Sequence, residues 1–251
     1  MGIGRRRRFI AAAGGGGGVP ERYHWTINGT NEILADFSQL SLGIANAWTV
    51  FVTALLNDTT DLGYLFMTPR GASNANRIHF FRNSGACQVV AFDSGGTVFK
   101  SYSLSDANSG IAQNVGFTIA ATWDGSSLLI YVDGTDKTSL ATKDTDDSGT
   151  MTDSPRDMRI GAQTSGLNQL ACKVQDFSVH PSTLSGANIG TLYSQVNDLD
   201  PMSGFSPTIH FTPQDADSPG LNIGSGSAFD LYDDASGIDS SNRVLGNLIT
   251  L

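Results

Sequence analysis

This 251-residue sequence has few cysteines, few glutamates and no long apolar segment. Its two cysteines, Cys87 and Cys172, are too few to make the disulfide framework of a cysteine-stapled secreted domain. No apolar run reaches the length that a transmembrane helix requires. We therefore expect two buried thiols that behave as small apolar side chains, with a single disulfide between them as the alternative.

Turn-forming residues are abundant. The chain contains 29 glycines and many aspartates, serines, threonines and asparagines, which is typical of short strands joined by turns. The length suits one large all-β domain with extensions, and it is sufficient for a sizeable core.

The clearest local pattern is an expected hairpin over residues 117–134. Two runs alternate apolar with small or polar residues, and Gly125, Ser126 and Ser127 separate them. Alternation with a period of two places every second side chain on one face of a sheet. Asp133-Gly134 closes the second run with the positive φ angles that tight turns require.

The order of several motifs extends this pattern into a family resemblance. Trp123-Asp124-Gly125 followed by Ile130-Tyr131-Val132-Asp133-Gly134 resembles the central hairpin of laminin G-like, concanavalin A-like lectin/glucanase domains. Further matching segments, in chain order, are residues 27–32, 47–52, 158–162, 173–179 and a closing helix over 184–193. The resemblance covers residues 23–196 and implies a two-sheet antiparallel jelly-roll sandwich.

We divide the chain into three parts. Residues 1–22 form an extended basic, glycine-rich N-terminal arm, and residues 23–198 form the all-β sandwich. Residues 199–251 form a loop-rich extension in which strands are expected over 208–211 and around 228–232. The formal net charge is −9, and because the arginines of the arm contribute +4, the rest of the chain carries −13.

The arm has three interpretations: a twin-arginine export signal, a nucleic-acid-binding arm, or an assembly arm that contacts a neighbouring subunit. Its apolar region is short, it lacks a cleavage site before Pro20, and no base-reading group accompanies its arginines. We favour the assembly arm. Its expected contact residues are Ile3, Arg5, Arg6, Arg7, Arg8, Phe9 and Ile10.

We expect no catalytic residues. The glucanases that the resemblance includes use a carboxylate pair, usually on a Glu-x-Asp-x-x-Glu strand. The chain has only Glu21 and Glu32, and both lie outside such a motif. The four histidines have no metal-ligand spacing and none lies near a nucleophile elbow.

Two kinds of ligand site remain as hypotheses. Asp144, Asp146 and Asp147 form an acidic loop that could hold calcium, although a solvated loop is the interpretation we favour, as it is for Asp230, Asp233 and Asp234. Sugars stack on exposed aromatic rings, and the candidate rings are Trp25, Tyr64, Phe81 and Tyr102. Each lies in or beside an expected strand, so packing in the core is the alternative for each ring. Trp48 and Trp123 are assigned to the core.

The resemblance extends to domains in tailed-phage structural proteins. It implies a non-catalytic virion component, a capsid decoration or cement protein held by its arm on a major capsid or tail protein and beside copies of itself. The alternatives are a carbohydrate-binding adhesin of a tail or fibre and a secreted bacterial carbohydrate-binding protein. The acidic body disfavours membrane and nucleic-acid partners, and no cofactor other than calcium is expected.

Deletion of residues 1–18 tests the assembly arm. We expect the truncated protein to lose its association with particles while its sandwich still folds, measured by co-sedimentation and circular dichroism. Replacement of Arg5 to Arg8 by serine separates charge from apolar contact. If association survives that change and ignores salt, Ile3, Phe9 and Ile10 make the contact instead.

Overall fold

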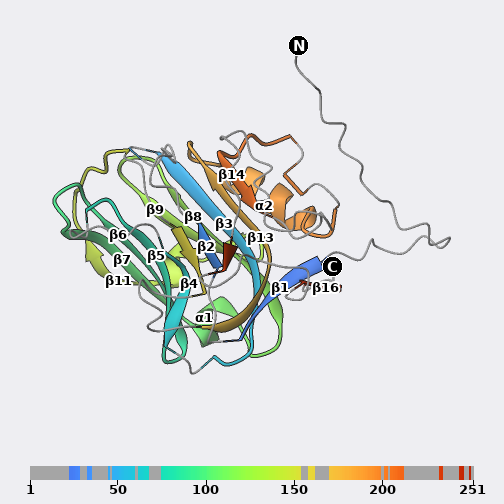
Figure 1. Cartoon of the computed structure of the whole chain (residues 1–251). Helices are drawn as coiled ribbons and strands as arrows, with labels where there is room; N and C mark the ends of the chain where they lie inside the picture. The colour runs from blue at the N-terminus through green and yellow to red at the C-terminus, as the bar shows by residue number, and fades with distance from the viewer. Residues whose placement is uncertain are drawn as a thin grey trace, which may run out of the picture.

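Two antiparallel β-sheets face each other in the computed structural model (Figure 1). The structure describes residues 23–28, 33–35, 45, 47–59, 62–67, 75–153, 158–161, 170–198, 201–202, 204–211, 232–233, 243–245 and 249. The arm, residues 1–22, therefore lies outside the described residues. The expected all-β sandwich of the concanavalin A-like type is confirmed.

Sheet A has the strand order β10-β9-β8-β3-β13-β1-β16, and β14 also pairs with β13. Its strands are β1 (Tyr23–Asn28), β3 (Trp48–Leu56), β8 (Gly116–Trp123), β9 (Leu128–Val132), β10 (Thr135–Asp136), β13 (Ala171–His180), β14 (Ile209–Phe211) and β16 (Arg243–Leu245).

Sheet B has the order β11-β7-β6-β5-β4-β12-β2-β15. Its strands are β2 (Ile33–Ala35), β4 (Gly63–Met67), β5 (Ile78–Asn83), β6 (Ala86–Phe92), β7 (Val98–Ser105), β11 (Thr142–Asp146), β12 (Met158–Ile160) and β15 (Tyr232–Asp233). Two short helices, α1 (Asp106–Ser109) and α2 (Gly186–Ser194), and a 3-10 turn, η1 (Thr138–Leu140), complete the described elements.

The expected hairpin is β8–β9. Asp124 closes its loop by accepting hydrogen bonds from the backbone amides of Ser126 and Ser127 at 2.8 and 2.7 Å. At the far end, Asp133 and Gly134 adopt φ angles of 48° and 72°, as the second turn requires. The hairpin is confirmed, and so are the strands that the motifs at 47–52, 158–162 and 173–179 predicted and the closing helix. Of the opening strand expected at 27–32, the structure describes only residues 27 and 28, at the end of β1.

The core lies between the sheets and follows the alternation of the strands. Trp48 and Trp123 are opposite each other in the β3–β8 register and both are buried, as predicted. Phe66 of sheet B meets Phe177 of sheet A with ring centroids 4.7 Å apart. Cys87 and Cys172 are free, buried thiols, and burial raises the pKa of the Cys172 thiol to about 12.

Gly161 shows why one family motif needs glycine. It follows β12 with a φ angle of +84°, and an added Cβ would lie 2.8 Å from Ile27 of β1. The residue therefore allows a left-handed turn and a close approach between segments of the two sheets.

The outer face of sheet A is covered. Helix α2 begins after Ser185, whose side chain caps it by accepting from the Asn188 amide at 3.2 Å. Ile189 and Leu192 of this helix pack in one cluster with Phe51 of β3 and Tyr131 of β9. Val196, Met202 and Ile249 extend the cover. Among the described residues, no helix is long and apolar enough to cross a membrane.

The C-terminal extension joins the sandwich through three strands, where one or two were expected. β14 pairs with β13, β15 with β2, and β16 with β1. The first confirms the strand expected over 208–211 and the second falls at the end of the expected 228–232 segment. β16 is three residues long, and its pairing depends on a partner that lies more than 200 residues earlier in the chain.

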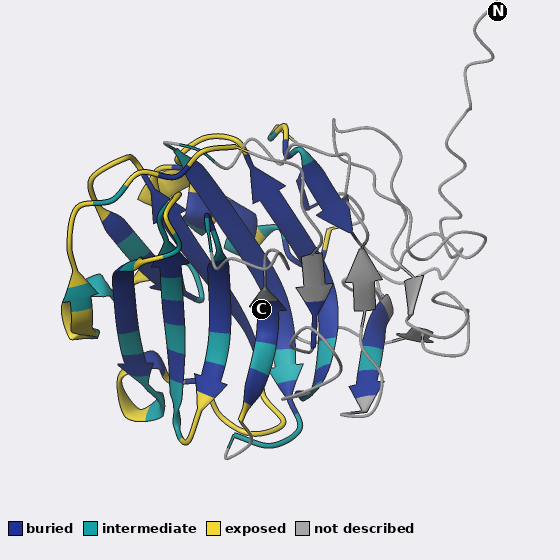
Figure 2. Cartoon of the chain, turned by 60° about the vertical axis from the view of Figure 1, so that its left-hand side comes forward, coloured by how far each residue is buried: buried dark blue, intermediate teal, exposed yellow. Residues whose placement is uncertain are grey.

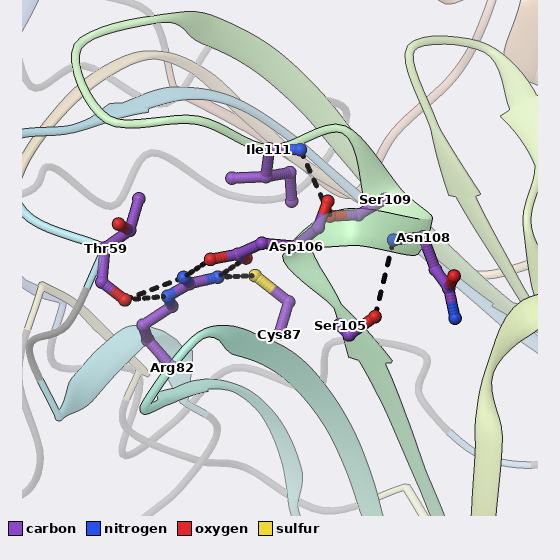
Figure 3. A network of polar contacts seen from close by, with 8 residues as sticks. All are labelled: Thr59, Arg82, Cys87, Ser105, Asp106, Asn108, Ser109 and Ile111. Atoms are coloured by element: carbon purple, nitrogen blue, oxygen red, sulfur yellow. Dashed lines mark hydrogen bonds and ion pairs between the residues drawn. The ribbon is translucent and has the colours of Figure 1, made fainter.

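A buried arginine braces the α1 end of the sandwich (Figure 3). Arg82 of β5 is 1% exposed and forms a bidentate ion pair with Asp106 of α1, in which one N–O distance is 2.5 Å. Its Nε and Nη2 atoms also donate to the carbonyl oxygen of Thr59 at 3.0 and 2.7 Å. The guanidinium thus joins the loop after β3, strand β5 and helix α1, with its charge fully paired.

We expect Asp106→Ala to destabilise the protein by about 3 kcal/mol, because it leaves the buried Arg82 guanidinium without its counter-charge. Urea unfolding followed by tryptophan fluorescence measures the change. Asp198→Ala removes an exposed carboxylate and serves as the control, with an expected effect within about 0.5 kcal/mol. Equal stability of the two variants would show that the pair does not brace the fold.

Candidate functional site

The outer face of sheet B carries mostly half-exposed side chains, with His79 and Ser101 buried among them. Residues that point into the core alternate along β4–β7 with residues that point away from it, and Figure 2 shows this alternation as teal bands between buried blue ones. The outward set, which we call the β4–β7 face, comprises Tyr64, His79, Phe81, Gln88, Val90, Phe92, Ser101 and Ser103.

Strand register aligns these side chains in two rows. One row runs Tyr64, Phe81, Gln88, Ser103 from β4 to β7. The other contains His79, Val90 and Ser101. Each row therefore begins with aromatic rings and ends with small polar groups.

Aromatic rings form the β4–β5 half of the face. The rings of Tyr64 and Phe81 are tilted, with centroids 4.7 Å apart. His79 contacts Tyr64 edge-on at 5.2 Å and Phe92 at 5.2 Å. Tyr64 and Phe81 are each half-buried, so part of each ring is open to a ligand.

Polar side chains form the β6–β7 half. Ser103 donates to Asp144 of the neighbouring β11 at 2.6 Å. The amide nitrogen of Gln88 lies 3.0 Å from the Ser101 hydroxyl and 3.3 Å from the same Asp144 carboxylate. These bonds hold donors and acceptors in fixed positions beside the aromatic pair.

Of the four predicted sugar-stacking residues, the structure brings two together and buries two. Tyr64 and Phe81 lie side by side on the β4–β7 face. Trp25 and Tyr102 are each 1% exposed and belong to the core between the sheets. The prediction was wrong for those two rings, because they lie on the inward phase of β1 and β7, in register with core residues.

The predicted calcium cluster is divided between the two sides of β11. Asp144 faces Ser103, whereas Asp146 accepts bonds from Lys100 at 2.5 Å, Tyr102 at 2.6 Å and Lys143 at 3.0 Å. The bond from Lys100, followed by those from Tyr102 and Lys143, holds the pKa of Asp146 far below its usual range.

Asp146 is therefore already neutralised by protein cations, and Asp147 is exposed beyond the end of the strand. Within the described part of the chain, no three histidine, cysteine, aspartate or glutamate side chains lie together as a metal site would require. The expected cluster of Asp144, Asp146 and Asp147 is thus corrected. Asp230, Asp234 and the Asp233 side chain lie outside what the structure describes.

Serine, histidine and aspartate do meet, but under the cover of sheet A. The Ser178 hydroxyl lies 3.1 Å from His180 Nε2, and His210 Nε2 lies 3.4 Å from Asp176 Oδ1. None of the four is more than 2% exposed. Burial, followed by the charge of His210, lowers the pKa of His180 to about 4. This cluster stabilises the packing of β14 on β13 and offers no access to a substrate.

The sequence analysis missed the polar partners Gln88, Ser101 and Ser103. Each is an ordinary polar residue on the outward phase of an alternating strand, and only the register of β5–β7 brings them beside Phe81. Counting the phase of each strand from its core residues could have identified them.

A family model described as the concanavalin A-like lectin/glucanases superfamily matches residues 14–190. A search among curated proteins found no match.

Among solved structures, the heptameric SAP-like pentraxin from Limulus polyphemus is similar, at a TM-score of 0.53 and 12% identity over 92% of this chain and 98% of the pentraxin. The receptor-binding domain of botulinum neurotoxin mosaic serotype C/D has a TM-score of 0.52 and 13% identity, over 70% of this chain and 46% of its own. The receptor-binding domain of botulinum neurotoxin D has a TM-score of 0.50 and 16% identity, over 70% of this chain and 44% of the toxin domain. At these identities the likeness concerns the fold alone, and this chain spans less than half of each toxin domain.

His79 makes stability depend on pH. Burial, followed by the nearby charge of Arg77, lowers the pKa of His79 to about 3 in the native state. In the unfolded chain the same imidazole has a pKa near 6.5. The unfolded state therefore binds a proton that the native state does not, and stability present above pH 6.5 is lost as the pH falls toward 3. The expected loss is about 1.4 kcal/mol per pH unit below pH 6.

Urea unfolding at pH 7, 6 and 5 measures this slope. His79→Phe, which keeps an aromatic ring between Tyr64 and Phe92, should reduce the slope while His180 maintains the remainder. An unchanged slope would mean that His79 binds its proton equally well in the native and unfolded states, so that folding does not lower its pKa.

Proposed function

The chain belongs to the concanavalin A-like lectin/glucanases superfamily, and from this membership we propose that it is a non-catalytic glycan-binding protein whose ligand lies on the β4–β7 face. One observation carries the proposal: the half-buried Tyr64–Phe81 pair lies in register with hydrogen-bonding side chains on the same open sheet surface. Sugar recognition combines an apolar ring contact with a few fixed polar groups.

The polar groups suit hydroxyl recognition. Asp144 accepts from Ser103 with one carboxylate oxygen, which also lies within reach of Gln88. A carboxylate has further lone pairs, so Asp144 can accept from ligand hydroxyls as well. Gln88 is half-buried and supplies an amide oxygen on the same side of the sheet.

Binding without hydrolysis is the activity that these residues support. Glycoside hydrolysis needs two carboxyl groups that flank the scissile bond. Asp144 is the carboxylate that hydrogen-bonds with the side chains of the β4–β7 face, and the hydrogen bonds of the described residues bring no second one to them. This arrangement supports binding over hydrolysis.

We also propose a setting for this activity, from the sequence alone. The basic arm anchors the acidic sandwich to a capsid or tail lattice, so that the protein is a virion component. A glycan-binding face favours the adhesin alternative over a purely cementing role, because a cement protein has no use for an outward sugar site. A secreted bacterial carbohydrate-binding protein would use the same face without the anchor.

Phe81→Ala tests the glycan site. We expect glycan binding to weaken about fivefold, because the ring contact contributes on the order of 1 kcal/mol. Titration calorimetry with the best ligand from a glycan array measures the change. Phe205→Ala removes a half-buried ring near His180 on the opposite sheet and should leave affinity unchanged. Equal affinities of the wild type and Phe81→Ala would place the ligand elsewhere.

A further inference from the structure

We propose that the glycan taken by the β4–β7 face carries a negatively charged group, a carboxylate or a sulfate, and that Arg77 beside His79 receives it. This inference rests on the proposed glycan binding and specifies its ligand class. It follows from two side-chain nitrogen atoms, Nε of Arg77 and Nε2 of His79, that have no hydrogen-bond partner among the described residues.

Arg77 immediately precedes β5 and has the same phase as His79 and Phe81. Its carbonyl oxygen accepts from the Phe92 amide at 2.9 Å, which fixes the residue beside the aromatic half of the face. The side chain is half-buried, and its Nε atom is buried without a hydrogen-bond partner. Among the described residues, no carboxylate forms an ion pair with this guanidinium.

An unpaired guanidinium at this depth is unusual in so acidic a chain. Partial desolvation of a charge is unfavourable unless an opposite charge or hydrogen bonds compensate for it. Within the described part of the chain, the buried Arg82 is fully paired, whereas Arg77 forms no ion pair and its Nε atom has no hydrogen-bond partner. Burial accordingly lowers the pKa of Arg77. An anionic ligand would supply the missing partner through the planar donor fork of the guanidinium.

His79 provides the second nitrogen atom without a partner. Its side chain is 7% exposed, and its Nε2 atom is buried without a hydrogen-bond partner. Because its pKa is lowered to about 3, the ring is neutral and offers one donor and one acceptor at neutral pH. Among the described residues, the groups that face it are Arg77, the Tyr64 ring and the apolar side chains of Val90 and Phe92, and none of these is a carboxylate.

The two open groups lie beside the stacking surface. Tyr64 contacts the His79 ring at 5.2 Å on one side and the Phe81 ring at 4.7 Å on the other. A sugar that stacks on Tyr64 and Phe81 can therefore direct an acidic substituent toward Arg77 and His79 while its hydroxyls face Gln88 and Asp144. Asp144 lies at the opposite end of the row, so its charge does not oppose the acidic group.

The test uses full-length protein and three matched oligosaccharides: a neutral galactan fragment, an oligogalacturonate of equal length and a sulfated galactan fragment. Calorimetry should show at least one acidic ligand bound about tenfold more tightly than the neutral one, with an affinity that falls as salt increases. Arg77→Gln should remove this preference and leave neutral binding intact. Lys173→Gln removes the same charge from β13 of sheet A and should change nothing.

Each outcome decides between the proposals. A preference for the carboxylated or for the sulfated ligand identifies the acidic group. Equal binding of all three ligands, unaffected by Arg77→Gln, overturns the anionic-sugar inference and leaves glycan binding standing. Absence of binding to any of the three and to a broad glycan array overturns both. The salt dependence of the wild-type protein gives the answer even if Arg77→Gln fails to fold.

Discussion

The double pairing of β3 is the constraint on which the sandwich depends. This strand is hydrogen-bonded to β8 along one edge and to β13 along the other, and both partners lie far away in the sequence. Its two faces are also both buried: Trp48, Val50 and Val52 face the core, and Phe51 faces the cover formed by α2. A slip of one residue would exchange these two sets, so packing on either side enforces a single register. Folding must therefore close long loops before its central strand is stable.

Local sequence patterns predicted the features that depend on residues close together in the chain. The β8–β9 hairpin and the buried Trp48 and Trp123 follow from alternation and turn residues, whereas the closing helix was expected from the family resemblance. All three are present, and helix α2 is capped by Ser185. The pairing of β16 with β1 and the ion pair between Arg82 and Asp106 depend on long-range contacts, which no short window of sequence contains. The candidate site was half predicted for the same reason. Aromatic type identified Tyr64 and Phe81, but only register distinguishes them from the buried Trp25 and Tyr102.

The two sheets treat polar groups on their outer faces in opposite ways. On sheet A, the cover closes over Asp176, Ser178, His180 and His210, which then bond to one another in a dry environment. On sheet B, the comparable positions hold Gln88, Ser103 and Asp144, whose bonds to one another leave capacity for a ligand. Similar residue types thus serve packing on sheet A and, in the function that we propose, recognition on sheet B. What separates the two roles is the presence of α2 and the segment after it, and not the chemistry of the strands.

For the glycan binding that we propose, the exposed outer face of sheet B limits how strongly one molecule can hold a sugar. Side chains standing on a sheet surround less of a bound sugar than an enclosed cavity would, so a single site gains little from desolvation. Strong binding then requires several sites that act together. Copies of the sandwich held at a fixed spacing, each presenting this face in the same direction, turn the second and later contacts into intramolecular events at high effective concentration. The geometry of the array, more than the affinity of one face, would set which surfaces are retained and for how long.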